Sequence, residues 1–299
     1  MPDTIQSMPS WKIWILATRP KTLGAALAPV LMGISMAYYD GLTHWPSAVV
    51  ALLGALLIQV GTNFANDFYD FKKGADTEDR LGPTRVTQAG LVAPEQIKWA
   101  FILVFMIVFL MGQYLVWRGG WPILLIGVLS ILFGILYTGG PYPLGYNGWA
   151  DLFVLIFFGP VAVGGTYFVQ ALSITPEVLL AGFAPGFLSC GLLAVNNLRD
   201  VETDRASGKR TLAVRFGVGM VRFEYVLSIA APLIIPVILV YQTGEHYWIL
   251  LTWLIIPLVI PPVKRVMRYQ ASPILNGVLA ATGQLLLIYG ILFSVGWLM

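Results

Sequence analysis

Long apolar runs are the feature that most restricts the folds available to this chain. Nine segments are continuously apolar over about the 20 residues that a helix needs to cross a bilayer. They cover residues 20–39, 47–66, 97–117, 121–138, 149–171, 177–197, 223–242, 247–263 and 276–298. Their apolar residues do not alternate with polar ones, which argues against strands. The pattern predicts an all-α membrane protein, a bundle of nine transmembrane helices forming a single domain over residues 1–299.

The composition supports a bilayer as the solvent. Hydrophobic residues make up 58% of the chain and charged residues 11%, with a mean hydropathy of +0.77, whereas a soluble protein carries about 25% charged residues. One cysteine excludes a disulfide or a cysteine-based metal centre within the chain. The two histidines have no metal-ligand spacing. Because the first ten residues contain no Lys or Arg, we expect the first helix to be retained rather than cleaved as a signal peptide.

The basic residues predict how the helices are oriented. If the N-terminus is inside, the inside connections are residues 67–96, 139–148, 198–222 and 264–275, and Arg118 is the only basic residue at the opposite side. Basic residues accumulate on the cytoplasmic side of membrane proteins. We therefore expect a plasma-membrane protein with a cytoplasmic N-terminus, and nine spans would place the C-terminus outside.

Charge is concentrated in two of the inside connections. Residues 67–85 and 199–215 carry 17 of the 33 charged residues within 36 positions. Each cluster follows an even-numbered apolar segment and contains Asn-x3-Asp, so the two read as a short internal repeat whose acidic helix ends face each other. The acidic and amide residues involved are Asn66, Asp67, Asp70 and Asp76 in the first cluster, and Asn196, Asp200 and Asp204 in the second.

This spacing favours a divalent cation with oxygen ligands. Positions i and i+4 share one face of a helix, and carboxylates stacked there repel one another at the edge of a low-dielectric region. Mg²⁺ relieves this repulsion with one or two carboxylates, while water and phosphate oxygens complete its coordination. Basic residues nearby are suited to the remaining phosphate oxygens. They are Lys72, Lys73, Arg80, Arg85, Lys209 and Arg210. The combination predicts a metal–diphosphate site.

Two alternatives, a solvated loop and a cation transporter, explain the charged clusters less well than a metal–diphosphate site does. A charged connection between membrane helices is usually a solvated loop that fixes topology, but two clusters with the same phase after even-numbered helices argue against it. A cation transporter would also need acidic residues. Charges in transporters usually lie near the bilayer midplane at broken helices, whereas these lie at helix ends among basic residues.

The two clusters also resemble a known family. The stretches NDFYDFKKGAD and NNLRDVETDRASGKRTL are similar to the two aspartate-rich motifs of the UbiA superfamily of intramembrane aromatic prenyltransferases, whose nine helices account for the whole chain. RPKTL at 19–23, DRLGPTR at 79–85 and GPYPLGYNGWAD at 140–151 resemble its menaquinone-pathway branch, the 1,4-dihydroxy-2-naphthoate polyprenyltransferases. The general motif NDxxDxxxD has an acid where this chain has Gly74, and the delayed Asp76 matches the spacing of that branch.

The resemblance implies a fold and a reaction. The fold is a nine-helix bundle with a central cavity open to the cytoplasmic side. The reaction is the Mg²⁺-dependent transfer of a polyprenyl group from an allylic diphosphate to 1,4-dihydroxy-2-naphthoate, with loss of CO₂, giving demethylmenaquinone. Within the family, 4-hydroxybenzoate, homogentisate and chlorophyllide are alternative acceptors. The partners are these substrates and membrane lipid, with no nucleic acid.

The resemblance also implies roles for single residues. Asp70 and Asp200 are the expected catalytic residues. Metal binding is expected of Asp67, Asp70, Asp76, Asp200 and Asp204, supported by Asn66 and Asn196. Diphosphate binding is expected of Arg80, Arg85, Lys209 and Arg210.

Two further groups are assigned with an alternative. Arg19 and Lys21 are candidates for binding the naphthoate carboxylate or, equally, for anchoring the first helix on the inside. Tyr137, Tyr142 and Tyr146 are candidates for lining the cavity and stabilising a carbocation by cation–π contact. Their alternative role is an aromatic belt at the membrane interface.

Overall fold

The computed structural model describes residues 8–74 and 81–299, and within these ranges the chain is helical and contains no strand. Asp76 and Arg80, both assigned above to the site, lie outside the described residues. The first half of the chain forms α2 (Ser10–Thr18), η1 (Pro20–Thr22), α3 (Leu23–Tyr39), α4 (Trp45–Lys72), α5 (Pro94–Gly119) and α6 (Trp121–Leu136).

The second half continues the same pattern of apolar helices joined by short connections. It forms η2 (Leu144–Tyr146), α7 (Ala150–Phe157), α8 (Pro160–Ala171), α9 (Pro176–Arg199), α10 (Val201–Ala206), α11 (Leu212–Thr243), η3 (Tyr247–Ile255), α12 (Ile256–Arg268) and α13 (Leu275–Leu298). The prediction of an all-α membrane bundle is confirmed.

The number of membrane spans differs from the expectation of nine. In the described residues eight helical stretches are long and apolar enough to cross a membrane. The segment expected at 121–138 forms α6, which has 16 residues and is shorter than the ~20 that span a bilayer. Three of these stretches join more than one helix: Ser10–Tyr39, Ala150–Ala171 and Tyr247–Arg268. In the second of them, Pro160 begins α8 directly after Gly159.

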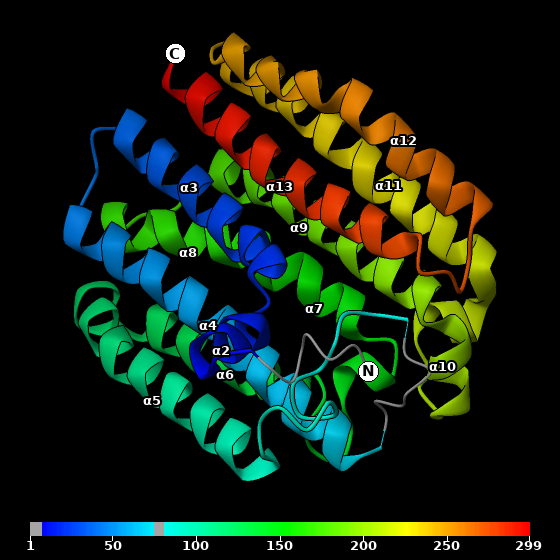
Figure 1. Cartoon of the computed structure of the whole chain (residues 1–299). Coiled ribbons are helices and arrows are strands. Elements are labelled where there is room, and N and C mark those ends of the chain that lie inside the picture. Colours follow the sequence, from blue (N-terminus) through cyan, green and yellow to red (C-terminus); the bar gives the residue numbers. More distant parts are fainter. Residues whose placement is uncertain (1–7, 75–80) are drawn as a thin grey trace.

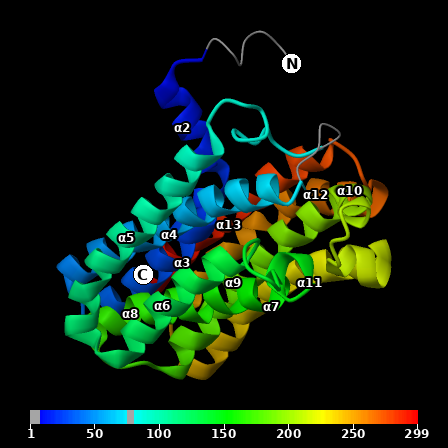
Figure 2. The same cartoon turned by 90° about the horizontal axis from the view of Figure 1, so that it is seen from below.

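The helices run side by side, with α5 at one edge of the bundle, α12 at the other and α9 between them (Figure 1). The larger hydrophobic core joins α3, α8, α9, α11 and α13. The smaller core joins α2, α4 and α5 with the loop at residues 86–92. Figure 2 shows α2 standing out from one end of the bundle beside this loop. The two cores pack two groups of helices, and the end of α4 lies in the smaller one.

Local sequence signals set the ends of the two helices that carry the acidic motifs. At the start of α4, the His44 side chain accepts a hydrogen bond from the Ser47 amide, and at the start of α9 the Thr175 side chain does the same for Val178. Both are N-caps, which satisfy backbone donors that the helix leaves free. After α4 the chain turns at Gly74 with a φ of 65°. Only glycine adopts this left-handed conformation without strain, which gives Gly74 a structural reason to replace an acid.

Candidate active site

One cavity of about 480 Å³ runs between the helices and contains most of the polar residues singled out above. Its wall on α4 extends from Val50 to Asp70, roughly 30 Å along a helix that rises about 1.5 Å per residue. Acidic and basic side chains lie at the Asp70 end, whereas the Val50 end is mostly apolar. The cavity therefore has a polar head and a long apolar limb.

Asp70 is the acidic residue that α4 contributes to the polar head. Its Oδ1 accepts a hydrogen bond from the Tyr146 hydroxyl at 2.8 Å, and its Oδ2 accepts one from Arg85 Nη2 at 3.1 Å. Both members of the Asp70–Arg85 ion pair are buried, so solvent screens the pair less than it screens a surface pair. Residues distant in the sequence thus fix the orientation of Asp70.

Asn66 and Asp67, one turn before Asp70 on α4, have different surroundings. Asn66 lines the cavity, and its Oδ1 accepts a hydrogen bond from Thr138 Oγ1 at 2.9 Å. Asp67 is buried but is not part of the cavity wall; its Oδ2 accepts a hydrogen bond from the Val86 amide at 3.2 Å. The expected metal-binding role of Asp67 therefore stays a prediction, since its side chain is not part of the cavity wall. Asp67 instead holds the loop that carries Arg85.

Tyr146 connects the two acidic segments. Its ring lies 4.7 Å from Lys73 Nζ and 4.6 Å from Lys209 Nζ, measured to the ring centroid. Its carbonyl accepts a hydrogen bond from the Arg210 amide at 2.7 Å. Lys73 Nζ also donates to the Thr138 carbonyl at 2.6 Å. The ring of Tyr146 therefore already makes cation–π contacts with lysines of the chain itself.

The second acidic segment crosses from α9 to α10 at Asp200. The Asp200 amide donates to the Asn196 carbonyl at 2.9 Å, and the Asp204 amide donates to the Asp200 carbonyl at 2.7 Å. The i to i−4 hydrogen bonding of an α-helix thus continues through the junction, although α9 ends at Arg199. The stripe of Asn196, Asp200 and Asp204 expected from the sequence is retained, and all three residues line the cavity.

Arg199 holds this segment in place, although no sequence motif pointed to it. Its Nε and Nη2 donate to the two carboxylate oxygens of Asp200 at 2.7 and 2.6 Å, the bidentate geometry in which arginine binds carboxylates most strongly. Its Nη1 donates to Asn276 Oδ1 at 2.8 Å, and Asn276 Nδ2 donates to the Leu81 carbonyl at 2.7 Å. Arg199 therefore ties α9 to α13 and to the loop after α4.

A lysine lies between the carboxylates of the two segments. Lys209 Nζ is 3.9 Å from Asp70 Oδ1 and 3.6 Å from Asp204 Oδ1. Burial raises the pKa of Asp204 to about 6; Lys209 opposes the shift, and the neighbouring Asp200 and Asp70 add to it. Burial also lowers the pKa of Lys73, which Asp70 opposes and Lys209 reinforces. A cation between Asp70 and Asp204 is what their mutual repulsion requires.

Arg19 enters the polar head from the junction between α2 and η1. Its φ of 52° lies in the left-handed region, which costs a residue other than glycine about 1–2 kcal/mol. Arg19 Nη2 donates to the Asn63 carbonyl at 3.4 Å, and Asn63 Nδ2 donates to the Thr18 carbonyl and Thr22 Oγ1 at 2.9 and 3.1 Å. The strained backbone is therefore held from α4, and it keeps Arg19 at the cavity wall.

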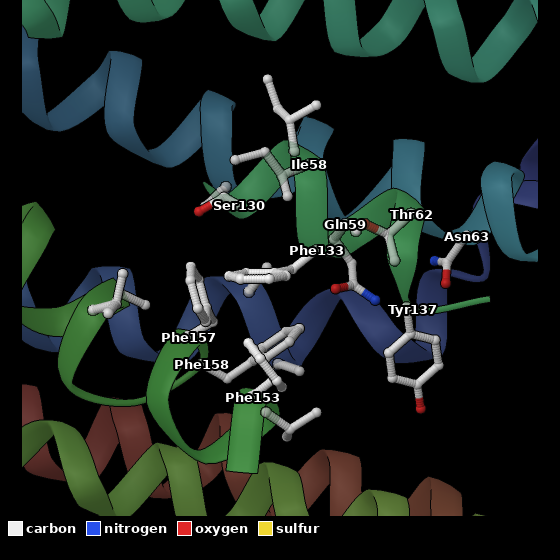
Figure 3. A pocket seen from close by; sticks show the side chains of 18 of the residues that line it. Ile58, Gln59, Thr62, Asn63, Ser130, Phe133, Tyr137, Phe153, Phe157 and Phe158 are labelled. Carbon is white, nitrogen blue, oxygen red and sulfur yellow. The ribbon is translucent and has the colours of Figure 1, made fainter. Parts of the chain in front are cut away.

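Aromatic side chains line the cavity beyond the polar head. The ring centroids of Phe133 on α6 and Phe153 on α7 lie 4.4 Å apart, and those of Phe133 and Phe157 lie 5.3 Å apart. Figure 3 shows these rings gathered on one side of the view, with Tyr137 and Asn63 on the other. A ligand with an ionic head and an apolar body would therefore meet charges first and aromatic rings next.

The sequence as a whole decides the family. The model of the UbiA prenyltransferase family matches residues 26–273, which is most of the chain.

The chain belongs to the UbiA prenyltransferase family.

Three curated relatives carry the same name. The chain is 36% identical to the 1,4-dihydroxy-2-naphthoate octaprenyltransferase of Haemophilus influenzae, with 96% of each sequence covered. It is 33% identical to the protein of the same name from Escherichia coli, covering 98% of this chain and 97% of that one. The protein of that name from Mycobacterium tuberculosis is 35% identical, with 90% and 88% covered.

Solved structures of UbiA homologues share the fold. The apo structure of a homologue from Aeropyrum pernix K1 gives a TM-score of 0.68 at 18% identity, covering 92% of this chain and 96% of that one. A homologue from Archaeoglobus fulgidus, bound to DMAPP and Mg²⁺, gives 0.63 at 16% identity, with 94% and 99% covered. Similarity at this identity supports the UbiA fold alone, and it agrees with the helical bundle described above.

Most of the described residues expected in a UbiA site do line the cavity. They are Asn66, Asp70, Asn196, Asp200 and Asp204 among the expected metal ligands, with Arg19, Arg85, Lys209, Tyr137 and Tyr146.

Three further expected residues do not line it, and their roles stay predictions. Lys21 is exposed within the short helix η1. Tyr142 lies between two prolines and is 56% exposed. Arg210 is exposed, and its backbone amide donates to the Tyr146 carbonyl.

The residues that sequence reasoning missed are mainly those that hold the site together. Thr138 donates to Asn66 and accepts from Lys73, and Asn276 bonds Arg199 from the start of α13. Arg199 stands in the second charged cluster beside Asp200, but nothing in the sequence assigned it a role. Asn276 carried no signal, since its partner lies 77 residues away in the chain.

The donor atoms at the polar head suit Mg²⁺. In the ranges described, no three carboxylate, imidazole or thiol side chains converge into a metal site by themselves. Mg²⁺ needs only one or two carboxylates beside waters and phosphate oxygens, and Asp70 and Asp204 supply two. Lys209 already places a positive charge between them. The residues present therefore fit a magnesium ion that binds together with a diphosphate.

Proposed function

We propose that this UbiA-family protein transfers a polyprenyl group from an allylic diphosphate to 1,4-dihydroxy-2-naphthoate, with loss of CO₂, to give demethylmenaquinone. Relatives that match over nearly their full length carry the name of this activity. The observation that carries the proposal is the continuous cavity, with its charged head at Asp70 and its apolar limb along α4. A prenyl diphosphate has the same division into an ionic head and an apolar chain.

The polar head would bind the diphosphate between the two acidic segments. Asp70 and Asp204 would hold Mg²⁺, with Asn66, Asn196 and Asp200 around it, and Asp76 is proposed as a further ligand. Mg²⁺ bound there supplies Lewis-acid stabilisation of the leaving diphosphate. Arg85 and Lys209 would release Asp70 and turn to the phosphate oxygens, and Arg80 and Arg210 are proposed to add positive charge there. Such preorganised charge is usually the largest catalytic contribution.

The aromatic part of the cavity would protect the cationic end of the prenyl group. When the carbon–oxygen bond of the allylic diphosphate breaks, positive charge develops on the prenyl carbon. The rings of Tyr137 and the phenylalanines present π faces to this charge and exclude water that would otherwise capture it. Tyr146 contributes differently, because its ring contacts Lys73 and Lys209; it would position those lysines.

Arg19 is the residue best placed to bind the naphthoate. It lines the cavity at the polar head, and a guanidinium binds a carboxylate through two parallel hydrogen bonds. An acceptor held there would lie between the charged head and the aromatic rings. Its electron-rich ring would then face the prenyl carbon that forms the new bond. The side of the molecule with both acidic segments is proposed to be cytoplasmic, where the diphosphate and Mg²⁺ are available.

The proposal is tested by product formation from defined substrates. The purified protein in lipid nanodiscs would receive 1,4-dihydroxy-2-naphthoate with farnesyl or longer prenyl diphosphates, and products would be identified by mass spectrometry. We expect a prenylated naphthoquinone and CO₂ with Mg²⁺, and neither with EDTA.

A panel of other acceptors gives the contrary outcome. If 4-hydroxybenzoate, homogentisate or chlorophyllide is prenylated while the naphthoate is not, the proposed acceptor is wrong, but the proposed prenyl-transfer activity stands. If no acceptor reacts, and proteoliposomes instead show Mg²⁺ flux, the enzymatic proposal itself fails.

A further inference from the structure

A second concave site lies outside the active-site cavity, where α12 connects to α13. It encloses about 700 Å³. Among the residues that the structure describes, three cationic side chains take part in its wall and no acidic side chain does. The residues that line it are Lys264, Arg265, Arg268, Tyr269, Pro273, Ile274 and Gly277. The composition of this wall favours an anion.

The three cations are close together on one helix. Lys264 and Arg268 are separated by four positions, and Arg265 and Arg268 by three, so they are neighbours on the surface of α12 and repel one another. None of the ion pairs formed among the described residues includes any of the three. The topology of the chain requires basic residues on this side, but it does not require that they converge on one pocket.

The start of α13 contributes further positive potential. A Cβ added at Gly277 would lie 3.7 Å from Arg265 Nη1, in ordinary van der Waals contact, so the guanidinium lies against the first turn of α13. The N-terminal end of a helix carries a partial positive charge from its aligned peptide dipoles. A ligand in the pocket would meet three side-chain cations and this helix end together.

The location distinguishes a lipid from a free anion. The Ala271 amide donates to the Leu198 carbonyl at 3.1 Å, which places the pocket at the end of the bundle that carries the acidic segments. The large apolar side chains beside it are exposed, with Ile274 at 44% and Met267 at 52%. Further along α12, Leu258 and Ile260 are exposed as well. Exposed apolar residues leading away from a basic pocket suit acyl chains below a phosphate.

We propose that this pocket binds the phosphate headgroup of an anionic phospholipid, whose acyl chains lie along the outer face of α12. Basic pockets between membrane helices on the cytoplasmic side bind such headgroups in other proteins. Arg265 and Arg268 would contact the phosphate oxygens, and Lys264 would add charge. The proposal is independent of the prenyl-transfer reaction, because none of these residues lines the active-site cavity.

Lipid retention measured by native mass spectrometry tests the proposal. The full-length protein would be reconstituted in nanodiscs of phosphatidylcholine with or without phosphatidylglycerol. The double variant R265Q/R268Q would be compared with K12Q/K98Q, which removes the same charge from cations outside the pocket. We expect the wild type and K12Q/K98Q to retain one phosphatidylglycerol, with at least a tenfold weaker apparent affinity in R265Q/R268Q.

Three results would overturn the proposal. Equal retention by the two double variants would mean that only overall charge matters. Equal retention of phosphatidylcholine by the wild type would remove the requirement for an anionic headgroup. Displacement of the lipid by inorganic phosphate or diphosphate at millimolar concentration would identify the ligand as a free anion. If R265Q/R268Q does not insert, R265K/R268K keeps the charge, and it should still lose affinity because lysine cannot bind phosphate through a two-pronged contact.

Discussion

The two acidic segments have the same Asn-x3-Asp spacing, but the fold holds them by different means. At the end of α4, Asp70 is held by Arg85 and Tyr146, which lie 15 and 76 residues further along the chain. At the end of α9, Asp200 is held by the adjacent Arg199. The first segment depends on two loops from elsewhere in the fold, whereas the second is secured at its own helix end.

This difference teaches which carboxylates are available to a ligand. Both oxygens of Asp200 are taken by Arg199, a buried partner that Asn276 also holds. The partners of Asp70 are instead a tyrosine and cations suited to diphosphate. Asp204, rather than Asp200, shares Lys209 with Asp70. We therefore propose Asp70 and Asp204 as the pair that faces a bound cation, with Asp200 in a positioning role.

The largest expected effect comes from removing the carboxylate of Asp70 at the end of α4. Asp70→Asn should lower prenyl transfer by about 10²–10³-fold or more, as expected when a preorganised electrostatic group is lost. Asp67→Asn is the matched variant, because Asp67 contacts the loop amide of Val86 and does not line the cavity. Turnover of both variants in nanodiscs measures the difference. Because Asp67 holds the loop that carries Arg85, a smaller loss is expected for Asp67→Asn, and equal losses would contradict the special role of the Asp70 carboxylate.

A large effect on stability is expected at the end of α9, where Arg199 holds Asp200. Arg199→Gln leaves the Asp200 carboxylate without its bidentate partner, and breaking a buried pair costs about 3–5 kcal/mol. Arg205→Gln should change the free energy of unfolding by less than about 1 kcal/mol, since its pair with Glu202 is mostly exposed. Thermal inactivation of both variants in detergent provides the measurement. A similar shift in both would mean that Arg199 does not anchor the segment.

The pH dependence of magnesium binding tests the pairing of Asp70 with Asp204. Because burial raises the pKa of Asp204 to about 6, this group is protonated below that pH and must lose its proton before a metal binds. Apparent Mg²⁺ affinity should therefore fall as pH decreases through 6, by about tenfold per unit, and level off above it.

Titration of diphosphate-dependent Mg²⁺ binding at several pH values gives the profile. Asp204→Asn should abolish the step near pH 6. An unchanged step in that variant would place the titrating group elsewhere.

The smallest expected effect on activity comes from changing the apolar limb of the cavity. Gly54 on α4 lines the cavity, and nothing lies within 4 Å of where its Cβ would be. A leucine at position 54 would fill open space roughly 24 Å from Asp70, at about 1.5 Å per residue. We expect Gly54→Leu to reduce turnover of long prenyl donors about tenfold and to spare geranyl diphosphate.

A matched glycine serves as the control for this substitution. Gly219 also has open space around its Cβ position but lies outside the cavity wall, so Gly219→Leu should leave the preference for chain length unchanged. Equal loss of short and long donors in Gly54→Leu would exclude the limb as the path of the prenyl chain.

Much of this architecture was predictable from the sequence. Continuous apolar runs predicted the helical membrane bundle, because backbone polar groups in a bilayer must be satisfied within a helix. The i and i+4 spacing predicted that Asn196, Asp200 and Asp204 share a face, and this spacing persists although the helix is interrupted at Asp200. The end of α6 at Leu136 lies two residues before the expected end at 138, where the sequence continues with Thr-Gly-Gly-Pro.

The sequence by itself determined that the chain suits a lipid bilayer, that it is helical and which acidic and basic residue types are candidates for the site. These features depend on residue type and local spacing. Only the tertiary structure decided which side chains meet. It turned Asp67 to the loop at Val86, gave Asp200 to Arg199, and brought Asp70 to Tyr146 and Lys209. Most of these contacts join residues far apart in the chain, and a buried charge accepts whichever partner the packing of distant helices places within reach.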